Sequence, residues 1–411
     1  MRSPRVAAPS VRTVEVSDPR DLLAHLPADD PVAWVREGEG MVGWGRFVRV
    51  DLGTGPQRFV RAQTALADVA ARLGSDGEVG LPGSGLVAFA SFTFDERSHG
   101  SVLVVPRVVL GRRQGRAWLT TVGDADVPPE LALRALPAPG RVRYARGGAD
   151  EVRWVEAVDE AVREIKDGQL DKVVLARDVR VWSQEPLDTR VLARRLAERF
   201  SSCFTFVCDG LVGATPELLL RLEAGRIESI VLAGSAPRGA DAASDQRLGQ
   251  ALLASSKDRQ EHELAVASVR DVLAGRCVQL SMDHTPRLLR LANVAHLAST
   301  AHGTLTDDRH VLDLVAALHP TAAVCGTPRA AALERIRALE GMDRGRYSGP
   351  VGWFDADGDG EWGIALRCAQ VHGNRARLFA GAGIVDGSLP EAELEETRLK
   401  LRAMQSALDG R

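Results

Sequence analysis

The segment LPEAELEETRLKLRAMQSAL (389–408) predicts a long amphipathic helix. Its apolar residues recur at helical spacing and form one stripe that faces a core; they are Leu394, Leu401, Met404 and Leu408. Ser388 and Glu391 have the spacing of a capping box, and Pro390 is acceptable in a first turn. The helix is therefore expected to begin near Ser388 and to pack on one side.

Three charged residues share a second face of this helix. Glu393, Glu396 and Lys400 are three and four residues apart, so their side chains point in similar directions. One interpretation is a solvated face with a Glu396–Lys400 ion pair worth ~0.3 kcal/mol. The other is a site at the edge of the core, where two carboxylates and an ammonium group point at the same place. The segment alone favours the solvated face, because charged residues are mostly exposed.

Composition excludes several classes of function. The 411 residues have room for two or three average domains or one large one, and 45% hydrophobic with 26% charged residues is typical of a globular protein with a sizeable core. A net charge of −3 argues against nucleic acid or an anionic membrane as the main partner. Five scattered cysteines without CxxC spacing indicate neither a disulfide framework nor a zinc site. With no membrane-length apolar run, we expect a soluble cytoplasmic protein with no membrane partner.

Strands and hairpins alternate with helices along the chain. Apolar, β-branched segments bounded by glycine predict strands at 85–94, 101–110 and 116–122. The proline- and glycine-rich connection 136–148 is either a linker or a long loop. A capped helix is expected from Asp150 to Gly168, and a second one over 255–275.

Lys172 begins the apolar strand KVVLARDVRVW (172–182). Alternation places it on the same face as Val174 and Ala176. It is either an edge lysine that extends to water or a buried functional group.

Glu217 lies at the open end of a predicted hairpin. The segments 217–222 and 226–234 turn at Ala224–Gly225, which sets Glu217 opposite Leu232. An acid in this position is either a surface strand end or a carboxyl group with a raised pKa. A later hairpin, 360–371 with 374–385, is expected to set Arg367 opposite Leu378.

A second acidic pair resembles the one near the C-terminus. Asp258 and Glu261 are three residues apart on the helix predicted over 255–275. Two such pairs suit Mg²⁺, with one carboxylate of each pair on the metal and the other holding metal-bound waters. Lys400 and Arg367 would grip an anionic substrate, and Lys172 with Glu217 would transfer protons. These residues indicate a magnesium enzyme acting on a small carboxylate.

At these residues the chain resembles the chorismate-binding enzymes, and among them the isochorismate synthases. The resemblance covers about 151–405, whereas 1–145 matches only loosely, as this part is variable in the family. The motifs that carry it, in order, are DKVVLAR (171–177), GATPELLLR (213–221), LAGSAPRG (232–239), SKDRQEHEL (256–264), AHLAST (295–300), LHPTAAVCGTP (318–328), RYSGPVG (346–352), EWGIALR (361–367), AGAGIV (380–385) and EAELEETRLK (391–400).

The resemblance implies an α+β fold in which residues 1–411 form one large domain, with two packed, mostly antiparallel sheets flanked by helices and the active site in the cleft between them. It implies chorismate as substrate and Mg²⁺ as cofactor. Lys172 would be the general base and Glu217 the general acid. Glu261 and Glu396 would bind the metal, with Asp258 and Glu393 holding its waters. The residues implied to line the substrate pocket are Gly234, Ser235, His296, Ala323, Tyr347, Arg367, Gly381 and Lys400.

The resemblance also separates the members of the family. Anthranilate synthases use ammonia and carry glutamine at the Lys172 position, and aminodeoxychorismate synthases use a nucleophilic lysine where Ala233 stands. Salicylate synthases share Lys172 and Glu217, usually have threonine near Ala323, and eliminate pyruvate from isochorismate. The expected function is isochorismate synthase, feeding menaquinone or siderophore biosynthesis, with salicylate synthase as the alternative. No glutamine amidotransferase partner is expected, and the protein is expected to be a monomer or weak dimer.

Overall fold

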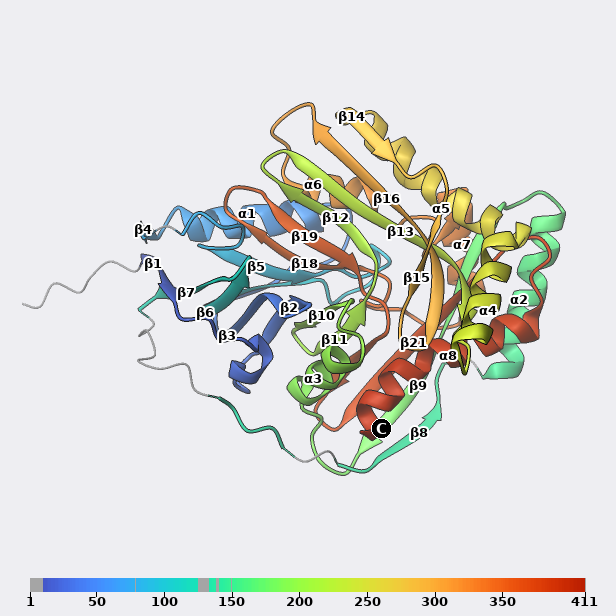
Figure 1. Cartoon of the computed structure of the whole chain (residues 1–411), viewed down its shortest axis with the longest axis horizontal. Helices are drawn as coiled ribbons and strands as arrows, with labels where there is room; N and C mark the ends of the chain where they lie inside the picture. Colours follow the sequence, from blue (N-terminus) through green and yellow to red (C-terminus); the bar gives the residue numbers. More distant parts are fainter. Residues whose placement is uncertain (1–9, 78, 125–132, 138–139, 149, 411) are drawn as a thin grey trace, which may run out of the picture.

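A computed structural model describes residues 10–77, 79–124, 133–137, 140–148 and 150–410 (Figure 1). The helices are η1 (Leu22–His25), α1 (Arg58–Ala70), α2 (Glu151–Lys166), α3 (Thr189–Arg199), α4 (Ala242–Ala254), α5 (Ser256–Ala274), α6 (Val311–Leu318), α7 (Arg329–Leu339) and α8 (Pro390–Asp409). The strands are β1 (Ser10–Val16), β2 (Val32–Arg36), β3 (Glu39–Asp51), β4 (Gly74–Asp76), β5 (Val87–Ser91), β6 (Val102–Arg113), β7 (Arg116–Gly123), β8 (Val142–Arg146), β9 (Lys172–Ser183), β10 (Phe204–Cys208), β11 (Leu211–Thr215), β12 (Leu218–Glu223), β13 (Arg226–Pro237), β14 (Cys277–Met282), β15 (Arg287–Arg290), β16 (Val294–Leu305), β17 (Gly326–Thr327), β18 (Pro350–Asp355), β19 (Gly360–Ile364), β20 (Cys368–His372) and β21 (Arg375–Ile384).

The described strands belong to one hydrogen-bonded network that folds over itself into two layers. The first layer runs β9–β21–β20–β11–β10–β2, and the second runs β5–β18–β19–β12–β13–β16. Strands β3 and β6 join them, because β3 pairs with β2 and β6 while β6 also pairs with β5. All these pairings are antiparallel; only β1 and β4 pair in parallel. The predicted α+β, mostly antiparallel fold is confirmed.

Apolar side chains from both layers meet in one buried cluster. Trp34 and Phe206 enter it from the first layer, and Leu218, Leu232 and Trp353 enter it from the second. Burying each such side chain stabilises the fold by roughly 1.5–3 kcal/mol. This cluster holds the layers face to face and fixes the space between them.

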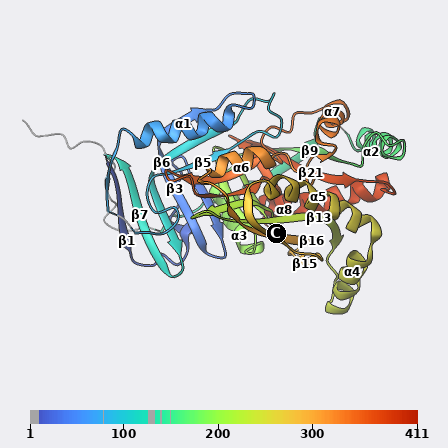
Figure 2. The same ribbon diagram turned by 90° about the horizontal axis from the view of Figure 1, so that it is seen from above.

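Helices cover the outer faces of both layers. Helices α3 and α8 pack on the first layer, where Leu401, Met404 and Leu408 of the predicted stripe are buried, and Leu394 is buried in another cluster. Helices α1, α5 and α6 cover the second layer. Figure 2 shows β1 and β7 at one end of the molecule and α2 and α7 at the other. No helix among the described residues is long and apolar enough to cross a membrane.

Several local predictions are confirmed and others are wrong. Helix α2 has Asp150 as its N-cap, as expected. Helix α8 begins differently: its N-cap is Leu389, which makes no side-chain cap, so the capping box is wrong. Ser388 instead accepts a hydrogen bond from the backbone N–H of Val385. The connection 136–148 is not a free linker, because its residues 142–146 form β8 on the edge of β9; residues 138 and 139 lie outside the described part.

The hairpin expected over 360–385 is broken in two. Strand β19 pairs in the second layer, whereas β20 pairs with β21 in the first, so the chain crosses between layers at Ala365–Arg367. Leu378 therefore lies opposite Ala369 rather than Arg367, and the predicted register is wrong. Arg367 makes this crossing with a φ of +45°, a conformation that a side chain other than glycine rarely adopts.

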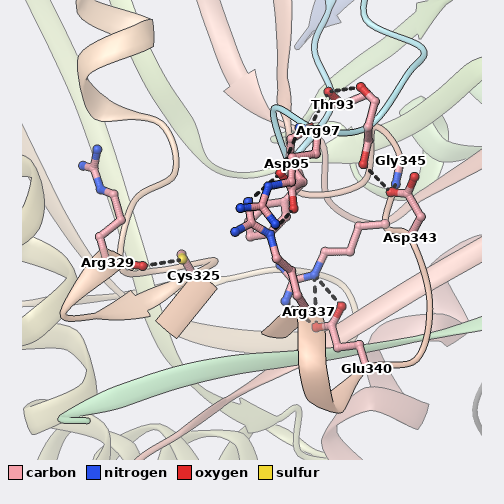
Figure 3. Close-up of polar contacts among 12 residues, drawn as sticks. Thr93, Asp95, Arg97, Cys325, Arg329, Arg337, Glu340, Asp343 and Gly345 are labelled. Carbon is pink, nitrogen blue, oxygen red and sulfur yellow. Dashed lines mark hydrogen bonds and ion pairs between the residues drawn. The ribbon is translucent and has the colours of Figure 1, made fainter. Parts of the chain in front are cut away.

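A buried ion pair anchors β9 to the segment that follows α7. The Arg344 guanidinium lies 2.5 Å from the Glu340 carboxylate and donates to the carbonyls of Val324 and Val174. Glu340 also accepts a hydrogen bond from the backbone N–H of Ala176. On the same side, Arg337 of α7 reaches Asp95, as Figure 3 shows. These contacts fix the segments that carry Val174 and Val324, which line the cavity described below.

Replacing Arg344 with methionine is expected to cost about 3–5 kcal/mol of unfolding free energy, because Glu340 would keep a buried charge without its cation. Urea unfolding followed by circular dichroism measures this loss. The control is Arg309→Met, which breaks the exposed pair with Asp307 and should cost under about 1 kcal/mol. Equal losses in the two variants would contradict the anchoring role.

Candidate active site

A cavity lies between the two layers. Strands β13 and β16 line one side, β21 lines the other, and α5 and α8 each contribute a side chain. Ten residues singled out from the sequence line it: Glu217, Gly234, Ser235, Glu261, His296, Ala323, Tyr347, Arg367, Gly381 and Lys400. Segments separated by almost two hundred residues thus converge on one space, in the cleft where the site was expected.

Lys172 is fully buried at the beginning of β9. The interpretation as an edge lysine that extends to water is therefore wrong. Its Nζ lies 3.1 Å from Oε1 of Glu261 in an ion pair, but finds no well-aligned hydrogen-bond acceptor among the described residues. Leaving the donors of a buried ammonium group without hydrogen bonds costs free energy, so this position favours the binding of a polar ligand.

Gly383 makes room for this pair and was not identified from the sequence. A Cβ atom at Gly383 would lie 2.0 Å from Oε1 of Glu261 and 3.2 Å from Cε of Lys172. Only a hydrogen side chain therefore permits Glu261 to approach β21. The close approach depends on tertiary contacts, so the motif AGAGIV gave no local sign of it.

Glu217 lies where the chain crosses from β11 in the first layer to β12 in the second. Its side chain is buried, and burial raises its pKa to about 8 against the opposing effects of Lys172, Arg367 and Lys400. Of the two interpretations of this acid, the structure favours the raised pKa. Glu217 thus carries a proton at neutral pH and can donate it within the cavity.

Arg367, His296 and Ser235 form a buried polar chain. The Arg367 guanidinium donates to Nε2 of His296, and Nδ1 of His296 lies 3.2 Å from the Gly234 carbonyl and 3.1 Å from the Ser235 hydroxyl. Because Nε2 accepts, Nδ1 carries the proton. Burial, together with Arg367 and Lys400, lowers the pKa of His296 well below its usual value, so the ring is neutral. This chain fixes the Arg367 side chain against the cavity wall.

Lys400 extends from α8 to the same cavity. It donates to the Gly381 carbonyl at 2.9 Å and pairs with Glu396 at 2.6 Å. Two cationic side chains, Arg367 and Lys400, therefore line the cavity, and a third, Lys172, lies behind the lining residue Glu261. This arrangement suits an anionic substrate with more than one carboxylate.

The four predicted metal-associated acids lie beside this cavity. Glu261 lines it, while Asp258, Glu393 and Glu396 line an adjoining hollow, and Ser235 borders both. Burial raises the pKa of Asp258, with smaller contributions from Glu261 and Glu396. Burial and then Glu396 raise the pKa of Glu393. The four carboxylates are thus close enough to affect one another.

All four donors are carboxylates, whose oxygens are the ligands that a hard divalent cation takes, and a bound cation would offset their mutual repulsion. In this conformation, however, three of the acids are paired with ammonium groups. The pairs are Glu261 with Lys172, Glu396 with Lys400, and Glu393 with Lys257. Within the described residues no three acidic, histidine or cysteine side chains are close enough together to hold an ion.

The face of α8 that carries Glu393, Glu396 and Lys400 does not form a solvated surface. Glu393 is 2% exposed, and the side chains of Glu396 and Lys400 are 21% and 20% exposed. The interpretation of these charges as a site at the edge of the core is the one that the structure supports.

Comparison with known proteins gives a consistent result. The family model described as chorismate binding enzyme matches residues 134–409. The chain is 42% identical over 267 residues to isochorismate synthase DhbC of Bacillus subtilis, covering 62% of this chain and 67% of that protein. It is 43% identical over 241 residues to isochorismate synthase EntC of Escherichia coli, covering 57% of this chain and 62% of that protein. The match thus leaves more than a third of EntC uncovered.

The fold comparison extends over nearly the whole chain. The structure of MenF, the menaquinone-specific isochorismate synthase from Escherichia coli, superposes with a TM-score of 0.78 at 26% identity. The superposition covers 98% of this chain and 95% of that one. With a family model that matches most of the chain and solved relatives that share its architecture, this protein belongs to the chorismate-binding enzyme family.

Proposed function

We propose that the protein is an isochorismate synthase that converts chorismate to isochorismate with Mg²⁺ as cofactor. The observation that carries the proposal is that a protonated buried acid, Glu217, and two cations line one cavity, while buried Lys172 lies next to it, paired with the lining residue Glu261. Relatives named isochorismate synthase at 42% and 43% identity support the same reaction.

The reaction assigns a role to each group. Lys172 must first give up the proton that it holds in the ion pair with Glu261; its amine then accepts a proton from a water molecule, whose oxygen forms a bond to C2 of the chorismate ring. The ring double bonds shift from C1–C2 and C5–C6 to C1–C6 and C4–C5. Glu217 donates its proton to the hydroxyl group leaving C4, which departs as water. One water enters and one leaves, so the substrate is isomerised.

The substrate's two carboxylates require cationic partners. Arg367 is held in place by its hydrogen bond to His296 and can donate two hydrogen bonds to one carboxylate, and Lys400 adds a second positive charge from α8. Glu261 and Glu396 would hold Mg²⁺, with Asp258 and Glu393 holding its waters. When bound, Mg²⁺ supplies positive charge that neutralises the ring carboxylate and screens it from these acids.

Incubating the protein with chorismate and Mg²⁺, and separating the products by chromatography, tests this proposal. Isochorismate as the sole new product is expected. Salicylate with an equal amount of pyruvate would replace the proposal by a salicylate synthase, and unchanged chorismate would overturn it. Ala323 in the cavity wall, where salicylate synthases usually have threonine, favours the first outcome.

Replacing Glu396 with glutamine is expected to weaken Mg²⁺ binding by at least about tenfold, because one of the charged ligands is lost. Isothermal titration of metal-free protein with MgCl₂ measures the change. Glu391→Gln, on an exposed position of the same helix, is the control and should leave the affinity unchanged. Full activity of the wild-type enzyme in excess chelator would remove the metal from the reaction.

A further inference from the structure

Lysine is rare in this chain, and its positions are informative. Of 52 lysine and arginine residues only four are lysines, at positions 166, 172, 257 and 400. Three of these four pair with carboxylates of the acidic set, as described above. The other basic residues of the chain are arginines, apart from Lys166. Lys257 is therefore notable as a lysine that pairs with an acid of the site.

Lys257 lies in the first turn of α5, next to Asp258. Its ammonium group donates a hydrogen bond to Oε1 of Glu393 on α8, which is itself 2% exposed. The Lys257 side chain is 32% exposed and lines the outer hollow with Asp258, Glu393 and Glu396, but it does not line the substrate cavity. Its position is thus on the metal side of the site rather than on the substrate side.

The charge of Lys257 acts on the whole acidic set. Burial lowers its pKa, but Glu393, and with smaller effect Glu261 and Glu396, raise it above the usual value for lysine. A compact ammonium group fits between carboxylates as a point charge, whereas the planar arginine side chain spreads its charge over a fork.

We propose that Lys257 is a built-in counter-cation of the acidic set: its ammonium group neutralises Glu393 in the metal-free protein and weakens the binding of a divalent cation beside it. The inference rests on the proposed function only for the identity of the cation. Without Lys257, Glu393 would be a buried carboxylate beside three other acids, which destabilises the metal-free site. With Lys257, a cation entering the site must overcome repulsion from a positive charge.

Titration of metal-free protein with MgCl₂, combined with thermal unfolding, tests this role. Lys257→Met is expected to bind Mg²⁺ about tenfold more tightly than the wild type, since a nearby positive charge is gone. The metal-free variant should also unfold at a lower temperature, and saturating Mg²⁺ should restore more of its stability than it adds to the wild type. Lys166→Met, which removes an exposed lysine at the end of α2, should change neither quantity.

Charge-conserving and milder variants keep the test decisive. Lys257→Arg should retain an affinity for Mg²⁺ near that of the wild type. Lys257→Gln also removes the charge, so it should show the tighter binding expected of Lys257→Met and replaces that variant if it does not fold. Unchanged or weaker Mg²⁺ binding after loss of the charge, or no binding by any of these proteins, overturns the inference. Failure of the wild type to form isochorismate, alongside tighter Mg²⁺ binding by Lys257→Met, would reject the proposed function alone.

Discussion

Replacing Lys172 with alanine is expected to lower kcat for isochorismate formation by about a thousandfold, within the range that a general base contributes. Lys172 is fully buried, and among the described residues it is the one that forms an ion pair with Glu261. The variant would therefore lack a group to deprotonate the attacking water. Turnover is measured at saturating chorismate, by chromatography of the products.

Binding separates a catalytic role of Lys172 from a structural one. The substitution leaves the cationic side chains of Arg367 and Lys400 in the cavity. Chorismate should therefore bind to the variant within a few-fold of its wild-type affinity. Mg²⁺ should bind at least as tightly, because Glu261 loses its competing ammonium partner. Lys166→Ala provides the matched control with full turnover. Wild-type turnover in Lys172→Ala would remove Lys172 from the mechanism.

Periodicity located the charged face of α8 but not its surroundings. Spacing places Glu393, Glu396 and Lys400 on one side of a helix whether that side meets water or protein. The deciding partners come from α5, more than a hundred residues earlier, and from β21. A pattern within one segment contains no information on such partners, so the solvated interpretation could be rejected only by the tertiary structure.

The position of Arg367 shows a second limit of sequence reasoning. Its segment has the alternation of one long strand, yet it leaves the second layer and joins the first at Ala365–Arg367. No glycine occupies the residue that takes the positive φ, so the local sequence gives no sign of the break. Glu217 lies at a similar crossing, after Pro216, and there the predicted hairpin register is consistent with a backbone hydrogen bond from Leu232.

Composition carried a signal that motif reasoning missed. Lys257 lies within the motif SKDRQEHEL, beside the residues to which metal roles were given, but its charge resembles that of an ordinary helix terminus. Its significance follows from the scarcity of lysine in the rest of the chain. The fold class could be predicted from the family resemblance and is confirmed, whereas the contact of Lys257 with Glu393 depends on the packing of α5 against α8, which no local pattern specifies.

Glu217→Gln is expected to reduce kcat by about a hundredfold or more, since glutamine keeps the shape of the side chain but has no acidic proton for the departing hydroxyl group. Chorismate binding should change little, because Glu217 is neutral at neutral pH in the wild type. The natural control is Glu223→Gln at the far end of the same hairpin, which should retain full activity. Comparable losses in both variants would indicate damage to the hairpin instead of loss of the acid.

The pH dependence of the two proteins gives the sharper test of Glu217. Because burial raises its pKa to about 8, the proton needed by the leaving group is present below that pH and lost above it. Wild-type kcat/KM should therefore fall as the pH rises through about 8, and the small residual activity of Glu217→Gln should lack this fall. Stability also falls as the pH rises, because the unfolded chain releases this proton at about pH 4.5 whereas the folded protein keeps it up to about pH 8. The wild type therefore loses stability between these two pH values. Glutamine is neutral throughout, so above pH 8 the Glu217→Gln variant should be more stable than the wild type. A wild-type stability that does not fall relative to the variant over this range would contradict a buried, protonated Glu217.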